Sequence, residues 1–191
     1  MGSIADYLSE NCSIFIGLDA RFCLAGETLI TVLGKERIYK KPVSEVKTGE
    51  YVLTYNGKNM IYSKVTKNIV DKGPKTFFTF KIRDKKANIK SISATENHSM
   101  IIFKKDNNEP QFKYSIQVKV GDLVRTTEGI GEVIEIKREI MENSFRLGVE
   151  HGTVLANDIL VGAFYYKEKD GNLKIIQNIL ATTKIPFENK N

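Results

Sequence analysis

The sequence predicts an all-β protein, and three features of it support this fold class. Short runs rich in Val, Ile, Thr, Tyr and Phe recur along the chain of 191 residues, and these residue types favour strands. Turn signals separate the runs, and Asn56-Gly57 is a typical two-residue hairpin turn. A seven-residue stretch that begins at Val46 returns 72 residues later, at Val118.

This internal repeat indicates a duplicated β unit. Val46-Lys47-Thr48-Gly49-Glu50-Tyr51-Val52 resembles Val118-Lys119-Val120-Gly121-Asp122-Leu123-Val124, and each copy reaches a glycine five residues later. Two copies are too few for a solenoid, which needs at least three. They fit two halves related by a pseudo-two-fold axis, the alternative being a chance similarity.

We expect the strands to follow the apolar and alternating segments between the turns. They are predicted at 28–33, 51–55, 60–70, 76–82, 89–94, 99–103, 129–136 and 145–147, and within 153–164. Asp71-Lys72-Gly73-Pro74 is predicted as a turn between two of them. In the C-terminal segment, Leu173, Ile176 and Leu180 lie at helical spacing and predict a short helix.

Composition argues against several classes of function. The 29 basic residues are interleaved with 23 acidic ones and form no like-charge block, which favours a solvated surface over nucleic-acid binding. No apolar run approaches the roughly 20 residues that span a bilayer. The two cysteines, Cys12 and Cys23, are too few for a disulfide scaffold or a metal site. We expect a monomer without cofactor or metal and without nucleic-acid or membrane partners, and the absence of a signal peptide favours a cytoplasmic location.

Two segments carry residues suited to nucleophilic chemistry. Cys23 stands directly before a glycine-containing turn and a predicted strand, although a free cysteine is often only a small buried apolar residue. In Thr95-Glu96-Asn97-His98, a turn aims a hydroxyl and an imidazole at one point. Histidine donates a proton near neutral pH, whereas a lone histidine is also common in cores.

Three segments together resemble the Hint superfamily, which contains inteins, bacterial intein-like domains, hedgehog autoprocessing domains and protist Vint domains. Cys23-Leu24-Ala25-Gly26-Glu27-Thr28 resembles the first intein block, C-(F/L)-x-G-(D/E)-T, and Thr95-Glu96-Asn97-His98 matches T-x-x-H. The stretch from Gly152 to Val161 is similar to the penultimate block. The resemblance implies a horseshoe of mostly antiparallel strands over 23–165, after a leader (1–22) and before a C-terminal extension (166–191).

The resemblance also implies a single-turnover self-processing activity. The thiol of Cys23 would attack the carbonyl carbon of Phe22 and form a thioester by an N-to-S acyl shift. His98 would protonate the Cys23 nitrogen, and Thr95 would hold either the Phe22 peptide or His98. The substrate is then the chain's own N-terminal flanking polypeptide, released by water or another small nucleophile.

The C-terminal motif departs from that of splicing inteins. Aligning the segment from Asn157 places Gly162 and Ala163 where those proteins carry His-Asn, so we expect no asparagine cyclisation, whether Ala163 is natural or an inactivating substitution. Asp71, which follows a hedgehog-like Tyr62-Ser63-Lys64-Val65, is a candidate base for the second step or a turn aspartate. His151 is a weaker catalytic candidate.

Other functions remain open at this point. A degenerate domain of the same fold would leave the Phe22–Cys23 bond intact. Cys23 and His98 also suit a cysteine protease that acts on other proteins, although no signature of such a family is present. A basic β-domain that binds nucleic acid is the most remote alternative.

Overall fold

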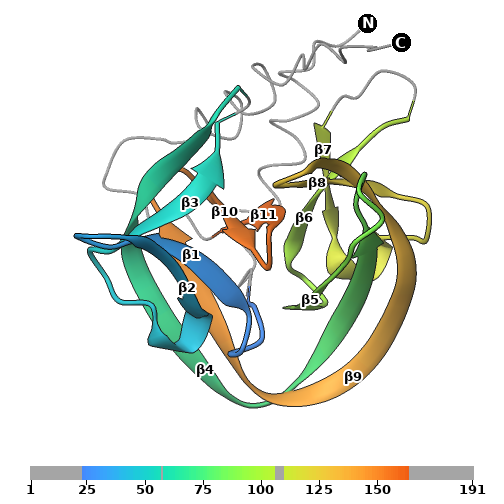
Figure 1. The fold of residues 1–191 in the computed structure, drawn as a ribbon. Coiled ribbons are helices and arrows are strands. Elements are labelled where there is room, and N and C mark those ends of the chain that lie inside the picture. Colours follow the sequence, from blue (N-terminus) through green and yellow to red (C-terminus); the bar gives the residue numbers. More distant parts are fainter. Residues whose placement is uncertain (1–22, 57, 106–109, 164–191) are drawn as a thin grey trace, which may run out of the picture.

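The computed structural model describes residues 23–56, 58–105 and 110–163 and confirms the all-β prediction (Figure 1). Within these residues, eleven strands form one sheet whose pairings are antiparallel. They are β1 (Leu29–Leu33), β2 (Ile38–Pro42), β3 (Tyr51–Tyr55), β4 (Met60–Arg83), β5 (Ile89–Thr95), β6 (Ser99–Phe103), β7 (Pro110–Tyr114), β8 (Leu123–Thr126), β9 (Gly129–Val149), β10 (Thr153–Ala156) and β11 (Ile159–Gly162). The predicted C-terminal helix and the leader lie outside the described residues.

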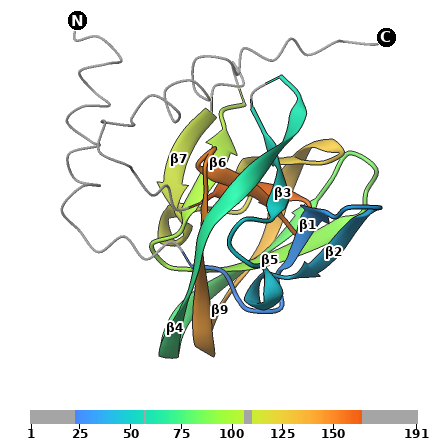
Figure 2. The ribbon, with the colours of Figure 1, turned by 90° about the vertical axis from the view of Figure 1, so that its left-hand side faces the viewer.

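Two long strands form the frame of the molecule. β4 and β9 span 24 and 21 residues and pair with each other from Val65–Val149 to Arg83–Glu132. Figure 1 shows the two strands curving together under the remaining strands, and Figure 2, turned by 90°, shows them side by side at the bottom of the molecule. The shape is the horseshoe expected from the sequence.

The predicted turn at 71–74 is instead an irregularity inside β4. The register of the β4–β9 pairing shifts between Asp71 and Pro74. Two residues of β4 lie between these paired positions, and only Asn143 lies between their partners Ser144 and Glu142, so β4 carries one extra residue. Gly73 and Asn143 both have a positive φ there, of 94° and 62°. Proline and glycine bend the strand at this point without ending it, because the long partner β9 continues to pair on either side.

The predicted duplication is present in three dimensions. The order β1–β2–β3 in one half corresponds to β6–β7–β8 in the other. Val32 pairs with Val52 as Ile102 pairs with Val124, and the β1–β2 hairpin has its counterpart in β6–β7. Each half also contains one short 3-10 turn, η1 (Val43–Glu45) and η2 (Ser115–Gln117), again 72 residues apart.

The repeated sequence itself makes the same hydrogen bonds twice. In each copy a glycine N–H donates to a valine carbonyl at 2.8 Å, and an acidic side chain accepts from the lysine N–H three residues earlier. The pairs are Gly49–Val65 and Gly121–Val133, with Lys47–Glu50 and Lys119–Asp122. Lysines of β2 and β7 reach the same two carboxylates. Both copies of the repeat therefore form the same local structure, and the alternative that their similarity is accidental is wrong.

The sequence did not predict three of the strands, which are Ile38–Pro42, Pro110–Tyr114 and Leu123–Thr126. Lysines interrupt the first two, so their apolar pattern is weak, and the third contains only four residues. The predicted strand region 153–164 is a hairpin of β10 and β11, turned at Asn157-Asp158, where both residues have a positive φ.

The interior of the horseshoe is filled by one large apolar cluster that takes residues from both halves. Valine and isoleucine dominate it, as expected for side chains that alternate on pleated strands. No helix in the described part of the chain is both long enough and apolar enough to cross a membrane.

Candidate active site

The site forms where the first described residues enter the centre of the sheet. Leu24 pairs with two strands at once: it exchanges two 2.9 Å backbone hydrogen bonds with Phe145 of β9, and it bridges Ala94 of β5 on its other side. The neighbouring Cys23 is fully buried as a free thiol. Two pairings therefore fix the backbone on the C-terminal side of the predicted nucleophile.

Thr95 holds the Cys23 residue through both backbone and side chain. Its N–H donates to the Cys23 carbonyl at 3.0 Å, and its Oγ1 accepts from the Cys23 N–H at 3.2 Å. That N–H belongs to the peptide bond predicted to break. The same hydroxyl lies 3.3 Å from the Cys23 carbonyl, to which it donates. These contacts join Thr95 to the Cys23 end of the predicted scissile peptide.

His98 closes the turn that begins at Thr95, its N–H donating to the Thr95 carbonyl at 2.8 Å. The ring is 1% exposed. Burial lowers the pKa of His98 to about 4, although hydrogen bonds to the backbone of Gly162 and Cys23 act in the opposite direction. The imidazole is therefore neutral near pH 7 and contacts both Cys23 and the end of β11.

Steric crowding explains the glycine at position 26, three residues after Cys23. A side chain on Gly26 would place its Cβ 2.8 Å from the ring of Phe145, the residue that pairs with Leu24. The phenyl ring thus packs over the turn that follows Cys23. This close approach explains why the position after Cys23-Leu24-Ala25 is glycine.

Gly162 and Ala163 end the described chain beside His98. A Cβ on Gly162 would lie 2.8 Å from Cβ and 2.9 Å from the carbonyl oxygen of Ser99. A larger residue requires the backbone of β6 or β11 to move. The Ala163 N–H donates to the Gly152 carbonyl at 2.9 Å, which fixes the chain direction after the hairpin.

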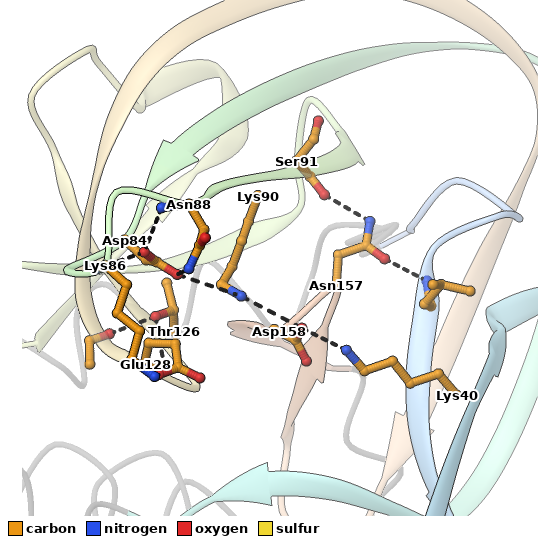
Figure 3. A network of polar contacts seen from close by, with 12 residues as sticks. Lys40, Asp84, Lys86, Asn88, Lys90, Ser91, Thr126, Glu128, Asn157 and Asp158 are labelled. Carbon is orange, nitrogen blue, oxygen red and sulfur yellow. Dashed lines mark hydrogen bonds and ion pairs between the residues drawn. The ribbon is translucent and has the colours of Figure 1, made fainter.

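Asn157 sits at the other end of the β10–β11 hairpin and ties together three elements (Figure 3). Its Oδ1 accepts from the Leu29 N–H and its Nδ2 donates to the Ser91 carbonyl, both at 2.7 Å. Beside it, Asp158 forms ion pairs with Lys40 and Lys90. These contacts give Asn157 a role in holding β1, β5 and the hairpin turn in place.

Asp71 lies in a cleft that reaches Thr95. The cleft has a volume of about 280 Å³ and is lined by Asp71, Lys75, Thr76, Thr95, Glu96, Asn97 and Ser144. Asp71 stands at the edge of the β4 irregularity, and Lys75 Nζ lies 3.6 Å from its carboxylate. The predicted base is therefore brought to the same cleft as a residue that holds the Cys23 peptide.

His151 is placed differently. It lies in the turn between β9 and β10, and its N–H donates to Ser63 Oγ at 2.9 Å. The ring is half-buried, and burial lowers its pKa. Its contact with Ser63 places it on the β4 side of that turn and gives it no part in the cluster of Cys23, Thr95 and His98 that the described contacts form.

The sequence predicts no role in the site for Ser144 or Phe145. Both come from β9, which pairs with Leu24 only in the folded chain, so no local motif marks them. Asn143 at a positive φ, directly opposite the β4 irregularity, is the available signal, because asparagine is enriched in the left-handed region.

The fold was compared with known proteins. No family model matches the sequence. Among solved structures, the gp41-1 intein is similar with a TM-score of 0.56 at 20% identity, covering 73% of this chain and 97% of that one. A variant of the Ssp DnaB mini-intein gives 0.62 at 19%, covering 76% and 96%. The bacterial intein-like domain from Clostridium thermocellum gives 0.57 at 19%, covering 73% and 97%.

The buried His98 makes stability depend on pH. Its pKa is about 4 in the folded chain, below the ordinary histidine pKa of 6.5 that applies in the unfolded chain, so the unfolded chain binds more protons between these pH values. Stability is then complete above pH 6.5 and falls as the pH drops towards 4, by ~3 kcal/mol. Urea unfolding of a Cys23→Ala chain, with and without His98→Gln, measures this: the substitution should flatten the pH dependence, and His151→Gln should leave most of it. An equal slope in all three chains contradicts the assignment.

The Asn157 contacts predict a structural cost. Asn157→Ala removes both hydrogen bonds and leaves a non-glycine residue at φ 48°. We expect a loss of about 2 kcal/mol in the free energy of unfolding, from the orphaned Leu29 N–H and Ser91 carbonyl and the left-handed backbone. Asn157→Asp keeps the acceptor and should lose less. Equal unfolding midpoints for the two variants would count against this role.

Proposed function

We propose that this chain, whose fold is that of inteins and intein-like domains, is a self-processing domain that breaks its own Phe22–Cys23 bond by an N-to-S acyl shift. The observation that carries the proposal is that both Thr95 and His98, from one turn, contact Cys23. One turn supplies a hydroxyl that accepts from the Cys23 N–H and a buried imidazole in contact with the Cys23 backbone. These are the groups that an acyl shift at this peptide bond requires.

In the first step the Cys23 sulfur attacks the carbonyl carbon of Phe22. A carbon–sulfur bond forms, the bond from that carbon to the Cys23 nitrogen breaks, and the nitrogen takes up a proton. The products are a thioester between Phe22 and the Cys23 side chain and a free α-amine on Cys23. An amide is more stable than a thioester, so the step depends on protonating the departing nitrogen.

The burial of His98 suits both halves of that proton transfer. Neutral imidazole is the form that accepts the thiol proton, and His98 is neutral near pH 7. Once protonated in its buried position it is a much stronger acid than an ordinary histidine, which favours transfer to the departing nitrogen. Thr95 keeps that nitrogen oriented through the 3.2 Å hydrogen bond.

In the second step water attacks the thioester carbon, the carbon–sulfur bond breaks, and the leader leaves with a carboxylate. The cleft beside Thr95 offers the space for that water, and two acidic residues, Asp71 and Glu96, line it; we assign the base to Asp71, which the sequence also predicted. Its carboxylate would accept the proton of the attacking water. Another small nucleophile that enters the cleft would be activated in the same way.

The end of β11 argues against splicing. A splicing reaction needs an asparagine side chain at position 163, where this chain has alanine. The tight contact of Gly162 with Ser99 leaves no room for a histidine before it unless the backbone shifts. This contact favours a domain adapted to N-terminal cleavage over a splicing domain inactivated at Ala163 alone.

The two cysteines supply a matched test of the nucleophile. Cys23→Ala should abolish thioester formation, and Cys12→Ala should leave the cleavage rate unchanged because the acyl shift uses only the residue at the scissile bond. Intact mass before and after incubation with a thiol measures the outcome: the unaltered chain should lose residues 1–22. Cleavage that persists in Cys23→Ala would refute the mechanism, and an uncleaved unaltered chain would indicate a non-cleaving domain.

The second step has its own variant. Asp71→Asn should slow release of the leader by water about a hundredfold, within the range for loss of a general base, while the thioester still forms. Trapping the thioester with hydroxylamine separates the two steps, because hydroxylamine needs little activation. Glu142→Gln, an exposed position on the opposing strand, is the control. Equal hydrolysis rates in both variants would remove Asp71 from the mechanism.

A further inference from the structure

The two halves of the domain can be compared residue by residue about the pseudo-two-fold axis. Leu24 and Ala94 face each other, and the hydrogen bonds on either side of this pair exchange when the two halves are exchanged. The turn that ends at Thr28 therefore corresponds to the turn that ends at His98, and both turns close with an i to i+3 backbone hydrogen bond. Thr28 is thus the counterpart of His98 in the other half.

One residue position supports the carbonyl group at the end of each turn. The Val43 N–H donates to the Thr28 carbonyl at 2.7 Å, and the Ser115 N–H donates to the His98 carbonyl at 2.9 Å. Val43 and Ser115 each begin a 3-10 turn, and both are fully buried. The backbone contact at this position is therefore common to both halves, and the side chain is what differs.

The difference is a hydroxyl group beside His98. Ser115 Oγ donates a second hydrogen bond to the His98 carbonyl, at 3.3 Å, whereas valine has no donor in its side chain. A carbonyl oxygen has two lone pairs, and at His98 a single residue supplies donors for both. Because valine fills the equivalent buried position at Val43, packing of the fold does not require a hydroxyl there.

The two bonds from Ser115 complete the support of His98. The Thr95 carbonyl accepts from the His98 N–H at 2.8 Å, so the peptide groups on both sides of the histidine are held. The ring that they direct is 1% exposed and contacts the backbone of Gly162 and Cys23. In the acyl shift this ring takes a proton from the thiol and returns it to the departing nitrogen. A misplacement of ~1 Å in such a group costs about a hundredfold in rate.

We propose that Ser115 is a positioning residue for the self-processing reaction: its hydroxyl fixes the His98 carbonyl and thereby holds the imidazole against Cys23. The inference rests on the proposed acyl shift and adds a residue that does not touch the reacting atoms. Ser115 follows His98 by 17 residues. The β6–β7 hairpin, closed by the pairing of Ser99 with Tyr114, returns the chain to His98, so no local motif marks this serine.

A pair of variants with the same side-chain shape isolates the hydroxyl. Ser115→Thr keeps it and Ser115→Val removes it, and the other half already accommodates valine at position 43. Thiol-induced cleavage, followed by intact mass, should be about tenfold slower in Ser115→Val than in Ser115→Thr, as expected for one lost hydrogen bond. Val43→Thr adds a hydroxyl to the other half and should leave the rate unchanged. Equal rates in Ser115→Val and Ser115→Thr overturn the proposal.

A second measurement does not need the reaction. In a Cys23→Ala chain, which cannot form the thioester, nuclear magnetic resonance reports the surroundings of the His98 ring. Its proton and nitrogen signals should stay in place in Ser115→Thr and should shift or split into several sets in Ser115→Val, while those of His151 stay in place in both. Unchanged His98 signals in Ser115→Val overturn the proposal even where cleavage slows. If the unaltered chain does not cleave, the acyl shift is refuted, and the ring signals alone decide whether Ser115 positions His98.

Discussion

The pairing of Leu24 with Ala94 is the contact on which the rest of the site depends. It joins the two duplicated halves at their pseudo-symmetry axis, with β4 and β9 bound on its outer sides. Because hydrogen bonds between antiparallel strands repeat at fixed spacing, this one pair decides which residues stand next to each other on either side of it. It brings the Cys23 peptide against Thr95 and, one turn further, against His98.

The duplication explains how two parts of one reaction come together. The Thr95–His98 turn and the Ala25–Thr28 turn are equivalent: each closes with one i to i+3 hydrogen bond, and each is bonded in the same way to its 3-10 turn. A local structure that occurs twice, facing itself across an axis, brings its two copies into contact. One copy follows the nucleophile and the other carries the hydroxyl and imidazole, so divergence of two similar turns is sufficient to build the site.

Burial sets the chemistry of this arrangement. Cys23 and His98 are both shielded from solvent, and this burial lowers the pKa of His98, so that its ring is neutral near pH 7. The cleft at Thr95 is the nearby open space, and it is bounded by the irregular stretch of β4 and β9. The two proposed steps therefore take place in different surroundings: the acyl shift in a closed site, and release of the acyl group where water enters.

The sequence alone determined the all-β class, the duplication and the segments with Cys23, Thr95 and His98, since each of these is encoded by local pattern. The 72-residue repeat is read directly from the chain, and its hydrogen bonds follow from the residues within it. The sequence also predicted a turn at Asp71. This prediction was wrong because Gly73-Pro74 bends β4 without ending it, since β9 pairs with β4 on both sides of the bend.

Only the tertiary structure decided what lies opposite these segments. Phe145 over Gly26, Ser99 against Gly162 and Ser144 in the cleft are contacts between residues distant along the chain, and no local periodicity records them. The sequence predicted Asn157 only as part of the C-terminal motif, and its structural role became visible for the same reason. Its side chain bonds to β1 and β5, which approach the hairpin turn only after the two halves close around one core.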